Sequence, residues 1–198
     1  AATDDSGNVF LAGGTSSDNA IATAGSHQST SGGWYDAFLV KFNSNGVRQW
    51  GTYYGGSNSD YGYSVATDGS NYVYLTGKTN SSDSIATEGA HQSIPGGYVD
   101  AFLVKFNSSG VREWGSYYGG SYNEEGNSLT IDGSGNVFLS GNTESTNSIA
   151  TTGSHQITLS GTSDAFLVKF ESEIINAQAP NLISPANNST NQPQNPFL

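Results

Sequence analysis

The stretch Asp36-Ala37-Phe38-Leu39-Val40-Lys41-Phe42 occurs three times in this chain, and it begins again at Asp100 and at Asp164. Both steps, from position 36 to 100 and from 100 to 164, are 64 residues long. The same step relates the apolar triplets at 9–11, 73–75 and 137–139. The chain is therefore a tandem repeat, and a residue that returns in every copy more often serves the repeated fold than a single active site.

The amino-acid composition indicates an all-β protein. Glycine accounts for 26 of the 198 residues, aromatic residues for 12% and charged residues for only 12%, which is typical of many short strands joined by tight turns. The net charge of −11 would repel phosphate backbones, so we expect no nucleic-acid partner. No apolar run reaches about 18 residues, so we expect no membrane insertion. The chain lacks cysteine, which excludes disulfides and thiolate metal sites.

Four short runs rich in β-branched and aromatic residues fall within each period. These runs predict strands, which in the second period lie at 63–67, 73–77, 101–107 and 111–118. In the first period, the sequence predicts strands at 9–13, 37–43 and 47–54. Turn residues at 68–71 and 107–110 indicate hairpins, whereas the connection at 78–100 is far longer than a hairpin loop. We expect almost no helix.

Both faces of the predicted sheet are apolar. Phe102, Val104 and Phe106 alternate with Ala101 and Leu103, so the strand presents apolar side chains in both directions. A four-stranded antiparallel sheet with two apolar faces fits between two sheets like itself, which describes a β-propeller blade. A stacked β-solenoid is the competing architecture, but its strands are parallel, and the hairpin turns favour the propeller.

Several motifs resemble the SBBP family of β-propeller repeats. They are Ser-Ser-Asp-Asn-Ala-Ile-Ala-Thr-Ala-Gly-Ser-His-Gln at 16–28, Gly32-Gly33, the repeated seven-residue motif, Trp-Gly-Thr-Tyr-Tyr-Gly-Gly at 50–56 and Asp-Gly-Ser at 68–70. The resemblance covers residues 1 to about 170, and the strand order is similar to that of NHL propellers. It implies a secreted or cell-surface protein of the kind frequent in bacteria, and it implies no catalytic residues. His27, His91 and His155 lie where many family members have an aromatic residue such as Phe.

The sequence predicts an incomplete propeller of about three blades, at 1–56, 57–120 and 121–170. The first repeat starts at the tail of its innermost strand, and the third stops after its third strand. Because about four to eight blades usually close a ring, we expect the remainder of the chain or neighbouring subunits to complete the propeller. Residues 171–198 are rich in Pro and Asn and resemble a linker followed by the truncated start of a fibronectin type III or immunoglobulin-like domain.

Repeated polar residues offer two alternatives, a chemical site or a structural role. Imidazoles at 27, 91 and 155 could bind a metal, but blades hold equivalent loops far apart, so we expect each His to be largely buried and to anchor its own loop. Asp4, Asp68 and Asp132 are expected to form Asx turns, and calcium is the one ion that their pattern leaves open. The motif aspartates at 36, 100 and 164 are expected to cap backbone amides or to pair with the motif lysine. No other cofactor is indicated.

The aromatic and acidic residues also have two interpretations each. Trp50 and Trp114 could stack on sugars, although their place in the last strand of a blade favours packing between blades. Asp60 corresponds to Glu124 at the 64-residue step, and with Glu125 these acids could in principle serve glycoside hydrolysis. Adjacent acids do not give facing carboxylates, so we expect solvated loop charges instead.

These observations predict a non-catalytic structural, adhesive or interaction module, secreted or at the cell surface. Two alternatives stay open: a carbohydrate-binding, lectin-like propeller, and a non-catalytic part of a glycan-degrading enzyme. The long second-to-third loop and the loop into the next innermost strand are expected on one face, which would contact glycans or other surface proteins. The candidate residues on these loops are His27, Gln28, His91, Gln92, His155, Gln156, Asp60, Tyr61, Tyr122, Glu124 and Glu125.

Overall fold

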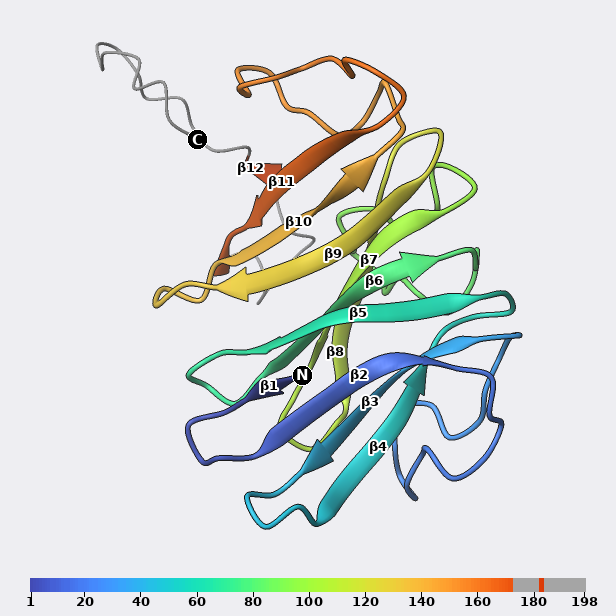
Figure 1. Cartoon of the computed structure of the whole chain (residues 1–198), viewed down its shortest axis with the longest axis vertical. Coiled ribbons are helices and arrows are strands. Elements are labelled where there is room, and N and C mark those ends of the chain that lie inside the picture. Colours follow the sequence, from blue (N-terminus) through green and yellow to red (C-terminus); the bar gives the residue numbers. More distant parts are fainter. Residues whose placement is uncertain (173–181, 184–198) are drawn as a thin grey trace.

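The computed structural model describes residues 1–172 and 182–183, which form three stacked four-stranded antiparallel sheets (Figure 1). Sheet 1 contains β1 (Ala2–Thr3), β2 (Val9–Thr15), β3 (Asp36–Phe42) and β4 (Arg48–Tyr54). Sheet 2 contains β5 (Asp60–Thr67), β6 (Val73–Thr79), β7 (Asp100–Phe106) and β8 (Arg112–Tyr118). Sheet 3 contains β9 (Glu124–Ile131), β10 (Val137–Thr143), β11 (Asp164–Phe170) and β12 (Leu182–Ile183).

The fold is all-β, as predicted, and consistent with an incomplete propeller. Each predicted strand matches an observed one to within a few residues, and the described residues contain no α-helix. In every sheet, consecutive strands pair in antiparallel fashion, which excludes the parallel solenoid. The sheets do not close into a barrel or a ring within the part of the chain that the structure describes. No helix there is long and apolar enough to cross a membrane.

One expectation about the third repeat is wrong. It does not stop after its third strand, because Lys169 and Phe170 of β11 pair with Ile183 and Leu182 of β12. β12 therefore supplies a short fourth strand from the segment expected to be a linker. The predicted start of a fibronectin type III or immunoglobulin-like domain otherwise lies outside the described residues.

The pairing register repeats from sheet to sheet. Leu11 pairs with Val40 in sheet 1, and the same partners return in sheet 2 as Leu75 and Val104 and in sheet 3 as Leu139 and Val168. Register fixes which side chains face each neighbouring sheet, because successive residues of a strand point to opposite faces. The repeated sequence therefore builds the same two faces three times.

Sheet 2 is buried on both sides. All seven residues of β7 are buried. Phe102, Val104 and Phe106 pack in the cluster shared with sheet 1, whereas Ala101 and Leu103 pack in the cluster shared with sheet 3. The apolar alternation read from the sequence thus becomes two cores, one at each junction between sheets.

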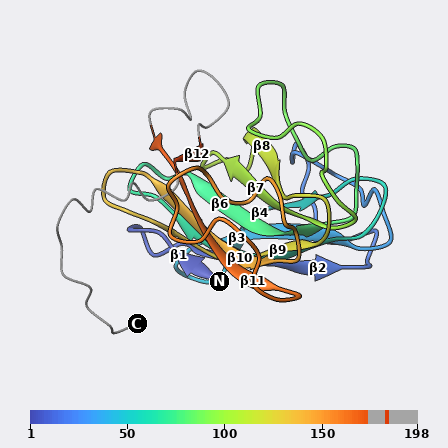
Figure 2. The same ribbon diagram turned by 90° about the horizontal axis from the view of Figure 1, so that it is seen from above.

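Long loops gather at one end of the strands, and tight turns gather at the other (Figure 2). The β2–β3 loop returns to the outer edge of sheet 1, where the Thr23 amide donates to Gly51 O (2.9 Å) and the Tyr53 amide donates to Gln28 O (3.1 Å). The β6–β7 loop covers β8 with the same two bonds 64 residues later. Each loop therefore satisfies backbone groups of an edge strand that would otherwise invite pairing with another chain.

Candidate interaction surface

The repeated histidines act mainly as aromatic packing groups at the junctions. The ring of His27 lies 6.2 Å from that of Tyr54 and 5.9 Å from that of Phe106, so it bridges sheets 1 and 2. Burial, with a smaller contribution from the Arg112 charge, lowers the pKa of His27 to about 4. The ring is therefore uncharged at neutral pH and packs as an aromatic group.

The other two histidines differ in their surroundings. His91 repeats the arrangement with Tyr118 and Phe170, at the junction of sheets 2 and 3. His155 is exposed, so the expectation of a largely buried residue is wrong for this copy. The reason is that no further described sheet lies beyond sheet 3 to cover it.

The glutamines that follow the histidines hold the backbone. Gln28 Oε1 accepts the Gly55 amide at 3.0 Å, and Gln92 Oε1 accepts the Gly119 amide at 2.9 Å. Gln156 instead donates to Asp164 Oδ2 at 2.7 Å. The neighbouring Gln residues therefore anchor these loops to the last strand of their own sheet.

Asp60 and Glu124 are fully buried, so their interpretation as solvated loop charges is wrong. Asp60 Oδ2 accepts the Gly56 amide and the Ser81 hydroxyl, both at 2.8 Å. Burial raises the pKa of Asp60 to about 6, and the neighbouring Asp36 carboxylate adds to this shift. Glu125, by contrast, forms a partly exposed ion pair with Lys78 at 2.6 Å.

The turn and motif aspartates have the structural roles predicted for them. Asp68 Oδ1 accepts the amides of Ser70 and Tyr72, both at 2.9 Å, which is an Asx turn, and Asp4 and Asp132 repeat it. The Asp36 carboxylate caps the Gly32 amide at 2.6 Å. Among the described residues, no group of three or more His, Asp or Glu side chains is placed to hold a metal ion.

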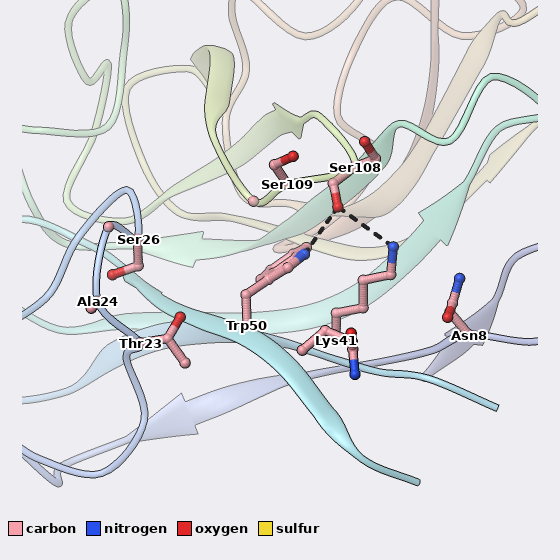
Figure 3. A pocket seen from close by; sticks show the side chains of 11 residues that line it. Asn8, Thr23, Ala24, Ser26, Lys41, Trp50, Ser108 and Ser109 are labelled. Carbon is pink, nitrogen blue, oxygen red and sulfur yellow. Dashed lines mark hydrogen bonds between the residues drawn. The ribbon is translucent and has the colours of Figure 1, made fainter. Parts of the chain in front are cut away.

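The two tryptophans of the last strands lie at the junctions, which supports the packing interpretation. Trp50 Nε1 donates to Ser108 O at 3.0 Å, and Gly110 lies so close to the ring that a Cβ there would be 2.8 Å from it (Figure 3). Trp114 packs against the cluster between sheets 2 and 3. Both side chains are only partly exposed.

A polar groove of about 410 Å³ borders Trp50 (Figure 3). Lys41 and Asn8 line one side of it, and the β2–β3 loop lines the other. At the next junction, Tyr72 replaces Asn8, and its ring centroid lies 3.7 Å from Lys105 Nζ. The groove therefore depends on a residue that differs between repeats.

The exposed aromatic residues gather where the β2–β3 and β6–β7 loops meet the links between sheets. Trp34 is 83% exposed, and Tyr98, which follows it by 64 residues, is 80% exposed. Tyr35 stacks on Tyr61 with ring centroids 5.3 Å apart. The Asp60 amide donates to Tyr35 O and the Tyr98 amide donates to Tyr122 O, so each long loop lies beside the link into the next sheet, as predicted. We call this surface the aromatic loop face: Trp34, Tyr35, Tyr61, Tyr98 and Tyr122.

Sequence reasoning selected Tyr61 and Tyr122 but missed Trp34 and Tyr98. Their signal was present, because each follows a Gly-Gly pair in a polar loop, outside any predicted strand. A large aromatic side chain in such a loop has no core to enter.

One family comparison agrees with this architecture. Residues 49–83 match the SBBP family, described as a β-propeller repeat. The SBBP match runs from β4 through the link between sheets into β5 and β6, so it spans the junction of sheets 1 and 2. No curated protein matched the chain.

Proposed function

We propose that this chain is a non-catalytic interaction module whose aromatic loop face contacts another protein. The observation that carries this proposal is the exposure of Trp34 and Tyr98 at equivalent positions of two repeats. Large exposed aromatic side chains are enriched where proteins bind one another. The SBBP match at 49–83 supports the same role, because propeller repeats are scaffolds for binding loops.

The absence of catalysis is part of the proposal. The repeated acids that could have served as a catalytic pair, Asp60 and Glu124, instead accept bonds from the backbone of the links between sheets. By resemblance to SBBP proteins, we place the module outside the cell or on the surface of a bacterium, with a structural or adhesive role.

Photocrosslinking tests the proposed surface. A benzophenone amino acid replaces Trp34, and in a control it replaces Val47, which is 57% exposed in the tight turn at the opposite end of sheet 1. With surface proteins of the source cells, we expect a discrete adduct from position 34 that disappears in Tyr98→Ala. Equal labelling from positions 34 and 47 would overturn the proposal.

Carbohydrate binding is the second candidate, and the surroundings of Trp34 favour it. The residues from 28 to 35 carry no acidic or basic side chain, and exposed rings amid uncharged polar groups suit the faces of neutral sugars. A glycan array tests this function with Trp34→Ala/Tyr98→Ala and the matched control Val47→Ala/Val111→Ala. Binding that only the first variant loses would support a lectin, and binding to no glycan would exclude it. The third alternative, a non-catalytic part of a glycan-degrading enzyme, would also require glycan binding here.

We further propose that sheets of the same kind, from the remainder of the chain or from neighbouring subunits, cover the two open sides of the stack. Val9 and Leu11 of sheet 1 are 38% and 43% exposed, whereas their equivalents Val73 and Leu75 in sheet 2 are fully buried. Sedimentation of the 198-residue chain should reveal self-association that Leu11→Asp reduces. A monodisperse monomer that melts cooperatively would contradict this proposal.

A further inference from the structure

Two buried carboxyl groups face each other at each junction between sheets. Asp36 begins β3 of sheet 1, Asp60 begins β5 of sheet 2, and both are fully buried. Both approach Gly55: a Cβ there would overlap Asp36 Oδ1 and would lie 2.6 Å from Asp60 Oδ2. The two oxygens therefore converge on the small space beside the glycine Cα. Only glycine leaves room for them.

One of these oxygens has no partner. Asp36 Oδ2 accepts the Ser31 hydroxyl and the Gly32 amide, both at 2.6 Å, but Asp36 Oδ1 is buried without any hydrogen bond. This orphan oxygen is the one that points toward Asp60. A buried acceptor without a donor is costly, and two facing carboxylates in a dry site repel each other. One positive charge between the two carboxyl groups would relieve both the repulsion and the missing hydrogen bond.

The second junction repeats the convergence of two acids with a longer partner, but its Asp100 Oδ1 is not orphaned, because it accepts the Gly96 amide at 3.1 Å. Asp100 and Glu124 converge on Gly119, where a Cβ would overlap Asp100 Oδ1 and lie 2.7 Å from Glu124 Oε2. Glu124 Oε1 also accepts the Thr143 hydroxyl at 2.5 Å. Burial raises the pKa of Asp100 to about 6, and the charge of Glu124 adds to the effect. Two independent copies thus place facing carboxyls from adjoining sheets against one glycine.

The surroundings favour a proton over a metal ion as the missing charge. Both carboxyls of the first pair already accept backbone amides, and no third carboxylate or imidazole joins them among the described residues. Calcium would need six to eight oxygen ligands. The other titratable or charged groups around the pair are the hydroxyls of Tyr53, Tyr54 and Tyr117, the carboxylates of Asp18 and Asp83, and the Arg112 guanidinium.

We propose that Asp36 and Asp60, and likewise Asp100 and Glu124, hold one proton between their two carboxyl groups, and that loss of this proton at rising pH loosens the junction of the adjoining sheets. The step is a deprotonation in which the proton passes to solvent and leaves two facing carboxylates. Because each pair joins neighbouring sheets, its charge state couples the stacking of the module to the pH outside it.

The test compares Asp36→Asn with the wild-type chain across pH. The Asn amide nitrogen takes the place of the orphan Asp36 Oδ1 and can donate to Asp60 Oδ2, while the Asn oxygen keeps the bonds from Ser31 and Gly32, so the variant mimics the protonated pair at every pH. We expect the melting temperature of the variant, relative to wild type, to rise by several degrees as the pH increases from 4.5 to 7.5. Asp164→Asn is the matched control, because this aspartate bonds to Gln156 and Ser160 and lies in the last sheet.

The possible outcomes separate cleanly. A difference between Asp36→Asn and wild type that stays constant with pH would overturn the proposal, as would an equal pH dependence in Asp164→Asn. Calcium that raises the melting temperature of wild type at pH 7.5, but not that of Asp36→Asn, would replace the proton with a metal ion. If Asp36→Asn does not fold, carbon-13 titration of the wild-type carboxyl groups decides: one buried Asp signal per junction must titrate near pH 6.

Discussion

Leu103 and Leu167 hold the same place in the repeated seven-residue motif, yet Leu103 is fully buried and Leu167 is 57% exposed. Leu103 packs in the core between sheets 2 and 3. Leu167 lies on β11 and has the same register, but no described sheet covers that side of sheet 3. Position in the stack, and not local sequence, therefore decides how much each copy of the motif contributes to stability.

The two leucines should respond differently to truncation. Leu103→Ala leaves a cavity in a closed junction and should lower the free energy of unfolding by about 2–5 kcal/mol. At concentrations where the chain is monomeric, Leu167→Ala removes a partly solvated side chain and should change the free energy of unfolding by no more than about 0.5 kcal/mol. Denaturant unfolding of both variants measures this. A large loss in Leu167→Ala would mean that another sheet covers it in solution.

Replacing Gly55 should destabilise the protein for a steric reason. A Cβ at Gly55 would overlap Asp36 Oδ1 inside a buried corner, so Gly55→Ala should cost about 1–3 kcal/mol or more. Gly69→Ala is the control, because no atom lies within 4 Å of its added Cβ and its φ is not positive. Thermal melts of the two variants give the comparison. Similar melting temperatures would show that the Asp36 side chain can move aside at no cost in stability.

His27 should make stability depend on pH in the sense opposite to the acid pairs. Its pKa is about 4 in the folded chain and about 6.5 when unfolded, so the stability contributed by the neutral ring is complete above pH 6.5 and is lost as the pH falls toward 4. His27→Phe removes this loss. The difference in free energy of unfolding between His27→Phe and wild type should therefore be about 1–2 kcal/mol larger at pH 5 than at pH 8.

His155→Phe provides the matched control. His155 is exposed in sheet 3, so the same substitution there replaces an imidazole that no described sheet covers. Urea unfolding at pH 5 and pH 8 measures both variants. If His27→Phe gains the same stability at both pH values, that gain comes from packing and not from protonation of the histidine.

The strands and turns could be predicted from sequence because their signals are local. Alternating apolar residues and Asx-turn chemistry determine β2 to β11 almost without tertiary information. The roles of the acids could not be predicted in the same way. Asp36 and Asp60 are 24 positions apart and meet only when two sheets stack on Gly55, so the sequence predicted a solvated charge at Asp60 where the structure has a buried one.

The candidate surface was predicted only in part, for a related reason. Strand alternation correctly placed the two kinds of loop at one end, but it could not tell which loop residues turn inward. Gln28 points to the backbone of its own sheet, whereas Trp34, six residues later, points to solvent. A hydrogen bond between segments 27 positions apart distinguishes Gln28 from Trp34, and neither composition nor period carries that information.

Gln28 itself gives the last prediction. Gln28→Ala removes the side-chain acceptor of the buried Gly55 amide, and a buried donor without a partner costs about 1–3 kcal/mol. The loop that covers the edge of β4 should loosen with it, so the amides of Tyr53 and Gly55 should exchange hydrogen faster. Gln156→Ala, at the equivalent exposed position in sheet 3, should change stability by no more than about 0.5 kcal/mol. Hydrogen exchange followed by NMR resolves both amides. Unchanged protection of Tyr53 and Gly55 in Gln28→Ala would show that the histidine packing, and not the glutamine, anchors the loop.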